Sequence, residues 1–120
     1  MRARVRVQLT CATVGVINFG TMRTDETPIL AMDFLNLLSP SSDTISTVAN
    51  WTTEVRSGTD AGHASLISGI ASTSGTKSRQ ALTGTGRTAG TTYWLFASMT
   101  SAAGQTFVGV GYIKVIDVED

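Results

Sequence analysis

The stretch TAGTTYWLFASMTSAAGQTFVGVGYIKVI, residues 88–116, contains two runs of β-branched and aromatic residues. A short turn that includes Gly104 joins them. Two such runs separated by a few residues with a glycine are typical of a β-hairpin. The sequence therefore predicts a hairpin with strands over 88–100 and 105–116 that closes an antiparallel sheet.

Strand alternation divides the side chains of this hairpin between two faces. If Tyr93 and Leu95 point into a core, Trp94 and Phe96 point outward. The residues that could join them on that outward face are Val108, Val110 and Tyr112, or Phe107 and Ile113. A monomer rarely exposes such an apolar patch without a use. The patch is therefore either a subunit interface, or it is covered by the N-terminal strands or another loop of the same chain.

The rest of the chain is read as short strands separated by Gly, Ser and Pro-rich turns. Strands are expected over 3–16, 45–55, 65–71 and 77–82, and loops or turns over 21–27, 39–42, 56–64, 72–76 and 84–86. The segment from Ile29 to Leu38 is ambiguous: its first half reads as a strand, although its leucine spacing also suits a short helix. About seven strands at this spacing predict an all-β sandwich.

Two aromatic residues suit the immunoglobulin-like form of that sandwich. Such domains often bury a Trp on a middle strand, and a Tyr near the start of a later strand bonds back to the preceding corner. Trp51 fits the first role and Tyr93 the second. Trp51, Tyr93 and Leu95 are accordingly the expected structural core.

Composition limits the class of protein. A chain of 120 residues allows one domain, and its charged fraction of 15% is low. Nine basic and nine acidic residues give a formal net charge of +0, which offers no field to attract nucleic acid or a membrane and favours association.

The basic residues are nevertheless uneven. Arg2, Arg4 and Arg6 alternate with apolar residues at the N-terminus. They suit either a solvated edge strand or an assembly arm that meets an acidic neighbour. We expect residues 1–27 to form this β extension or arm, and residues 28–120 to form the sandwich.

Cofactor, metal and export signals are not apparent. Cys11 is the single cysteine, so an intramolecular disulfide or a cysteine zinc site cannot form. No run of about 18 apolar residues predicts a membrane span, and the N-terminus does not resemble a signal peptide. The sequence predicts synthesis in a cytoplasm, with no cofactor and no metal.

Catalytic patterns are weak as well. His63 is the only histidine, and Asp60 and Ser65 near it lie on an expected loop, which is a poor basis for a Ser-His-Asp arrangement. The segment 69–78 resembles a phosphate-binding loop only superficially, because a residue separates Gly75 from Lys77 and the following sequence is β-rich. We expect no enzyme.

A set of residues between 28 and 118 resembles small immunoglobulin-like virion proteins of tailed bacteriophages. The residues that carry the resemblance are Asp43-Thr44-Ile45, Trp51, Thr88-Ala89-Gly90-Thr91-Thr92-Tyr93, Ser101, Ala103-Gly104, Thr106, Ile113 and Val115. The family implies a head-associated structural role, such as capsid decoration or cementing. This chain differs in its added N-terminal segment and in an unusually apolar last strand.

The expected function is therefore that of a virion structural protein assembled in the host cytoplasm. Its expected partners are the major capsid protein or other virion subunits, including copies of itself, bound through β-edges and the apolar hairpin face. The interface residues would be Arg2, Arg4, Arg6, Trp94, Phe96, Val108, Val110 and Tyr112. The alternatives are a receptor- or glycan-binding module of a fibre or tail, and a neck or tail subunit.

Overall fold

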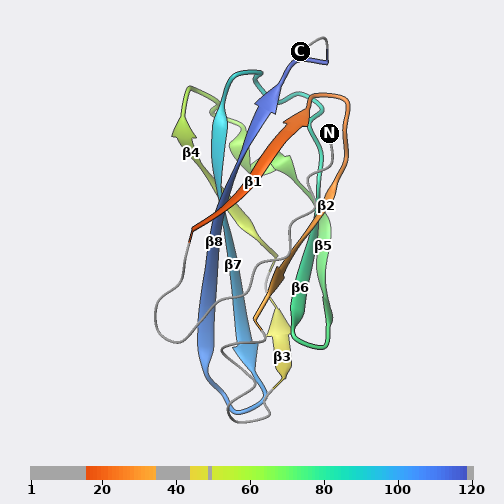
Figure 1. The fold of residues 1–120 in the computed structure, drawn as a ribbon, viewed down its shortest axis with the longest axis vertical. Helices are drawn as coiled ribbons and strands as arrows, with labels where there is room; N and C mark the ends of the chain where they lie inside the picture. The colour runs from red at the N-terminus through yellow and green to blue at the C-terminus, as the bar shows by residue number, and fades with distance from the viewer. Residues whose placement is uncertain (1–15, 35–43, 49, 119–120) are drawn as a thin grey trace.

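Two β-sheets pack face to face in the computed structural model, which describes residues 16–34, 44–48 and 50–118 (Figure 1). The elements are β1 (Val16–Arg23), β2 (Ile29–Asp33), β3 (Ile45–Val48), β4 (Thr52–Ser57), the 3₁₀-helix η2 (His63–Leu66), β5 (Ile67–Ser74), β6 (Lys77–Leu82), β7 (Thr92–Ser101) and β8 (Thr106–Ile116). The expected all-β sandwich is confirmed, with eight strands among the described residues.

The strand order is that of an immunoglobulin-like sandwich. The smaller sheet runs β2-β6-β5, and the larger runs β1-β8-β7-β3, with β4 also paired to β7. These positions correspond to the B-E-D strands and to the G-F-C strands of that fold. The first strand is the exception to an antiparallel arrangement, because β1 pairs in parallel with β8.

β1 is an integral strand of the larger sheet. It contributes Ile17, Phe19 and Met22 to the core, where each is at most 4% exposed. Residues 16–23 therefore form a strand of the larger sheet and contribute to its core. Local patterning did not reveal this because β1 is completed by a partner some ninety residues away. The first fifteen residues, with Arg2, Arg4, Arg6 and Cys11, lie outside the described residues.

The predicted hairpin is confirmed, although its first strand begins at Thr92 and not at residue 88. β7 and β8 pair antiparallel from Thr92↔Lys114 to Thr100↔Thr106, and every second residue of β7 is buried. The turn places Gly104 at φ +90°, a conformation that glycine adopts without steric cost. Alternation therefore assigns the two faces correctly along the whole of β7.

The expected strand over 45–55 is divided in two. β3 and β4 both pair with β7, but three residues lie between Val48 and Thr52 while two lie between their partners Met99 and Phe96. Trp51 lies at this break and is 2% exposed.

Trp51 also connects the two sheets through polar bonds. Its Nε1 donates to Ser78 Oγ at 2.9 Å, and its backbone N–H donates to Gln80 Oε1 at 3.2 Å. Both partners are buried on β6. The ring packs near Phe19, with 6.2 Å between centroids. Trp51, Tyr93 and Leu95 are all buried in the core.

Smaller differences concern the loops. The segment expected as a loop over 56–64 contains the end of β4 and the start of η2, and β5 begins at Ile67 and continues to Ser74. The strand over 77–82 has the predicted bounds. The first half of the ambiguous segment is the strand β2, and residues 35–43 lie outside the description.

Candidate functional site

The outward-facing surface of β4, β7, β8 and β1, here called the outer face, carries the aromatic residues of the hairpin. Cross-strand pairing aligns Trp94 with Tyr112, and Phe96 with Val110. The rows continue onto the flanking strands, where Glu54 pairs with Trp94 and Asn18 with Tyr112. The face therefore presents an ordered ladder of side chains across four strands.

Trp94 and Tyr112 meet edge to face. Their ring centroids lie 5.9 Å apart at 90°, and Phe96 lies 6.5 Å from Trp94. Such geometry adds about 0.5–1.5 kcal/mol beyond area burial. The aromatic side chains thus hold one another in fixed positions on the surface.

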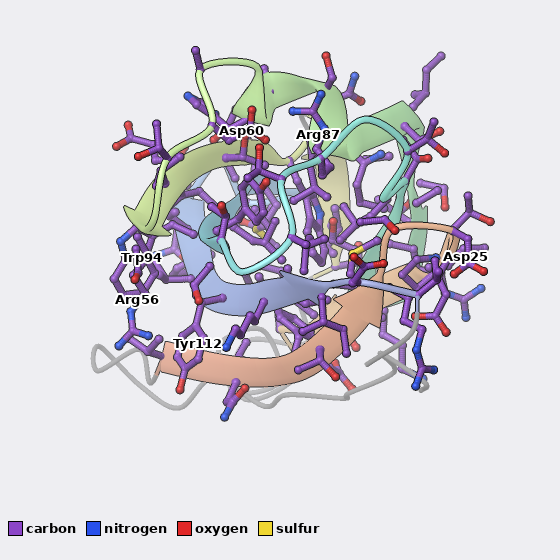
Figure 2. All side chains as sticks on the ribbon, turned by 90° about the horizontal axis from the view of Figure 1, so that it is seen from above. Asp25, Arg56, Asp60, Arg87, Trp94 and Tyr112 are labelled. Atoms are coloured by element: carbon purple, nitrogen blue, oxygen red, sulfur yellow. The ribbon has the colours of Figure 1, made fainter. Side chains whose placement is uncertain are left out.

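Arg56 completes this cluster. Its guanidinium carbon lies 4.2 Å from the ring centroid of Tyr112 and 5.0 Å from that of Trp94. Figure 2 shows the three side chains gathered at one side of the molecule, away from Asp60 and Arg87. A guanidinium stacked on aromatic rings keeps its N–H edges available to an anion. We call Arg56, Trp94 and Tyr112 the aromatic–arginine cluster.

Sequence reasoning did not identify Arg56 as part of this site. It was placed at the start of a loop, whereas β4 extends through it to Ser57. The β4 register shifts between Val55 and Ser57, and this bulge leaves Arg56 outside the regular pairing. The alternation Thr52, Glu54, Arg56 was the available signal.

The expected interface residues of β7 and β8 do come together on the outer face. Trp94, Phe96, Val110 and Tyr112 are half-buried by their neighbours, and Val108 is 43% exposed. Val110 and Tyr112, rather than Phe107 and Ile113, lie beside the aromatic residues of β7. The face also gains Val16 of β1, which is 54% exposed. Its apolar surface is therefore continuous from β7 to β1.

The hydrogen-bond partners of Asp60 are Tyr93, Arg87 and Gly62 and do not include His63. Asp60 Oδ2 accepts hydrogen bonds from the Tyr93 hydroxyl at 2.7 Å and from Arg87 Nη1 at 2.9 Å, and Oδ1 accepts from the Gly62 N–H at 3.0 Å. The Tyr93 hydroxyl accepts in turn from the Thr88 N–H at 3.3 Å. This arrangement ties two loops to the start of β7, as the tyrosine corner of immunoglobulin-like domains does.

Burial, hydrogen bonds and the charge of Arg87 together set the pKa values of this corner. Burial alone raises the pKa of Asp60, but the hydrogen bonds from Tyr93 and Gly62 and the charge of Arg87 outweigh it, so the pKa lies below its ordinary value. Burial and the bond to Asp60 raise the pKa of Tyr93 to about 12. Both shifts favour the paired form in which Asp60 is ionised and Tyr93 is neutral, which suits a structural role.

His63 is engaged elsewhere. The Thr53 hydroxyl donates to the His63 carbonyl oxygen at 3.0 Å and lies 2.8 Å from His63 Nδ1. Because the hydroxyl proton is already used, Nδ1 must carry the proton of this second bond. The Asp60–His63 pairing that an acyl-transfer site requires is therefore not formed.

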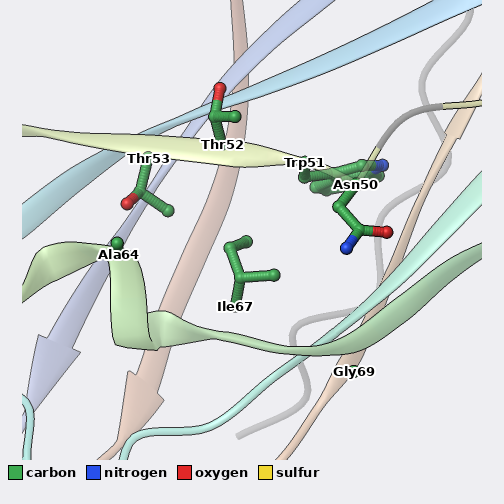
Figure 3. Close-up of a pocket in the computed structure, with 7 residues that line it drawn as sticks. All are labelled: Asn50, Trp51, Thr52, Thr53, Ala64, Ile67 and Gly69. Atoms are coloured by element: carbon green, nitrogen blue, oxygen red, sulfur yellow. The ribbon is translucent and has the colours of Figure 1, made fainter.

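A small cleft opens between the edges of the two sheets (Figure 3). It has a volume of about 350 Å³, and the residues that line it are Asn50, Trp51, Thr52, Thr53, Ala64, Ile67 and Gly69. The polar Asn50 side chain already accepts the Ala71 N–H at 2.9 Å. The cleft therefore offers a mainly apolar wall with no convergent set of charged groups.

Within the described ranges, no three His, Cys, Asp or Glu residues come together as a metal site requires. No helix in the described part of the chain is long and apolar enough to cross a membrane. No protein-family model matches the sequence, and a search of curated proteins finds no significant match.

Proposed function

We propose that this chain is a non-enzymatic structural protein that binds neighbouring protein subunits through its outer face. The observation that carries the proposal is the aromatic–arginine cluster beside a continuous apolar row. Trp, Tyr and Arg are the residue types most enriched in the energetic centres of protein interfaces. Here all three are in contact on the surface of a sheet whose inner face is fully packed without them.

The class of assembly is proposed from the sequence resemblance. A head-associated role in a tailed-phage virion, as a decoration or cement protein bound to the major capsid protein, suits a small sandwich with a low content of charge. In an assembled particle, one broad sheet face can meet a neighbour while the loops at the ends remain accessible. Because the formal net charge is +0, no net electrostatic repulsion between copies opposes this association.

The geometry favours protein binding over glycan binding. A sugar site needs an accessible ring face on which the sugar can stack. Arg56 lies over both Trp94 and Tyr112, and the Trp51 ring beside the cleft is 2% exposed. The cluster is better suited to an ion pair with a protein carboxylate than to carbohydrate stacking.

The test is co-sedimentation with empty heads assembled from the major capsid protein of the same genome. The variant Trp94→Ser/Phe96→Ser should keep the circular-dichroism spectrum of the parent but lose stoichiometric pelleting. Ile70→Ser is the matched control, because Ile70 is 87% exposed on the other sheet and its replacement should leave pelleting unchanged. A parent chain that stays in the supernatant would refute the decoration role.

A further inference from the structure

Three side chains that carry N–H donors lie around Tyr112 on the outer face. The guanidinium carbon of Arg56 is 4.2 Å from the Tyr112 ring centroid. Asn18 of β1 pairs with Tyr112, and Lys114 follows it two residues later on the same face of β8. Strand geometry therefore places the backbone of Asn18 about 5 Å and that of Lys114 about 7 Å from the backbone of Tyr112.

These donors are available to an external acceptor. Within the residues that the structure describes, neither the Arg56 nor the Lys114 side chain forms a hydrogen bond or an ion pair. Both residues are exposed. The Asn18 Oδ1 atom already accepts the Gly20 N–H at 2.8 Å, so the part of this amide left for a partner is its NH₂ donor. Because Arg56 is stacked on two rings, its guanidinium is also held in position before a partner binds.

Glu54 is the one carboxylate on the four described strands that form the outer face. It pairs with Trp94, and Trp94 pairs with Tyr112, so Glu54 lies two strands away from Tyr112. Two strand spacings amount to about 10 Å, which is about one Debye length at 0.1 M salt. The donors around Tyr112 therefore keep most of their attraction for an anion from outside.

An apolar row borders this group of donors. Phe96, Val110 and Val16 pair side by side on β7, β8 and β1, two residues along the strands from the row of Tyr112. Val108 continues the apolar surface on β8 and is 43% exposed. Nucleic acids bind mainly through their phosphates and would leave this row uncovered. A protein segment that combines an acidic with an apolar side chain would use both parts of the face.

We propose that the outer face binds an acidic and apolar segment of a neighbouring protein subunit, whose Asp or Glu carboxylate is bound by Arg56, Lys114 and Asn18. The inference rests on the proposed docking function and names the chemistry of the partner. An ionised carboxylate is purely an acceptor, and the planar guanidinium can donate to both of its oxygens. An apolar side chain of the same segment covers the row of Phe96 and Val110, where burial of apolar surface adds to the affinity.

Charge-neutral variants of the intact chain test the sign of the partner's charge by pelleting with empty heads. Arg56→Gln should weaken binding about tenfold or more, because it removes the cation that contacts the carboxylate. Lys114→Gln should weaken it about threefold, as expected for a more exposed ion pair. Glu54→Gln should bind at least as tightly as the parent, because it removes a charge of the same sign as the partner's. The affinity of the parent should also fall as NaCl is raised from about 50 to 500 mM, and that of Arg56→Gln should fall less steeply, which a mere packing role of Arg56 would not cause.

Arg79→Gln is the matched control, because Arg79 is exposed on β6 of the opposite sheet and its change should leave pelleting intact. Circular dichroism of each variant establishes that it is folded. If Arg56→Gln and Lys114→Gln pellet like the parent while Trp94→Ser/Phe96→Ser does not, the docking function stands and the carboxylate partner is refuted. Weaker binding by Glu54→Gln would overturn the proposal as well, since the partner would then supply a cation. A parent that stays in the supernatant refutes the docking and this inference together.

Discussion

Replacing Tyr93 by phenylalanine removes one oxygen from the buried corner that joins two loops to β7. The hydroxyl donates to the ionised Asp60 at 2.7 Å and accepts the Thr88 N–H at 3.3 Å. A hydrogen bond to a charged group contributes about 1.5–3 kcal/mol. We therefore expect Tyr93→Phe to lower the free energy of unfolding by about 2–3 kcal/mol at pH 7.

The pH dependence gives a second estimate of the same quantity. The pKa of Tyr93 is raised from its ordinary value of 10.0 to about 12 in the folded protein. A group whose pKa is raised on folding contributes stability that is complete below its unfolded pKa and is lost as the pH rises through the folded value. Two pKa units correspond to about 2.7 kcal/mol, lost between about pH 10 and pH 12. The parent and the variant should therefore converge in stability at alkaline pH.

Urea unfolding followed by tryptophan fluorescence at several values between pH 7 and pH 12 measures this convergence. Tyr112→Phe is the control, because the Tyr112 hydroxyl has no hydrogen bond to another described residue, and its loss should cost less than about 0.5 kcal/mol at pH 7. A Tyr93→Phe variant as stable as the parent at pH 7, or a difference that persists unchanged at pH 12, would refute this account of the corner.

Three further changes probe the corner and the packing of β1. Asp60→Asn should lower stability by about 3 kcal/mol in urea unfolding at pH 7, because Arg87 keeps its charge with only 10% of its side chain exposed. Burial opposes ionisation of Asp60, but its hydrogen bonds and Arg87 outweigh burial and lower its pKa on folding. The ionised carboxylate of the parent therefore adds to the free energy of unfolding above about pH 4, and this addition is lost in more acidic solution. The parent should therefore lose more stability than the variant between about pH 4 and pH 2. Gly111→Ala should cost about 1–3 kcal/mol by thermal denaturation, because its Cβ would lie 2.4 Å from the Phe19 ring, and Phe19→Leu in the same chain should recover part of this loss. Gly84→Ala places a Cβ 2.4 Å from a backbone carbonyl oxygen at the end of β1 and should lower the melting temperature without changing head binding.

The hairpin could be predicted because its information is local. Alternation along β7 fixes which side chains enter the core, and the glycine turn fixes which strand is its neighbour. The bounds of β6 follow from flanking turn residues in the same way. Trp51 and Tyr93 could be assigned because both roles recur in immunoglobulin-like domains.

Other features depend on contacts that local patterning does not encode. β1 becomes a core strand only through its parallel pairing with β8. Asp60 was expected on a loop, and only the closure of the sandwich brings it to Tyr93, thirty-three residues later. Arg56 joins the aromatic cluster because β4 continues to Ser57 beside β7, and a segment interpreted as a loop does not show this pairing. In each case the missing information is the register between distant strands.

The two faces of β7 show why the outer face invites a functional explanation. Leu95, Ala97 and Met99 are at most 1% exposed, so the inner face completes its packing without help from the other side. Solvated sheet faces usually carry polar residues, because exposed aromatic surface promotes association. Trp94 and Phe96 occupy such positions, and Arg56 covers part of the aromatic surface while keeping a charge outward. A partner that supplies a carboxylate and an apolar surface would complete this face as the facing sheet completes the inner one.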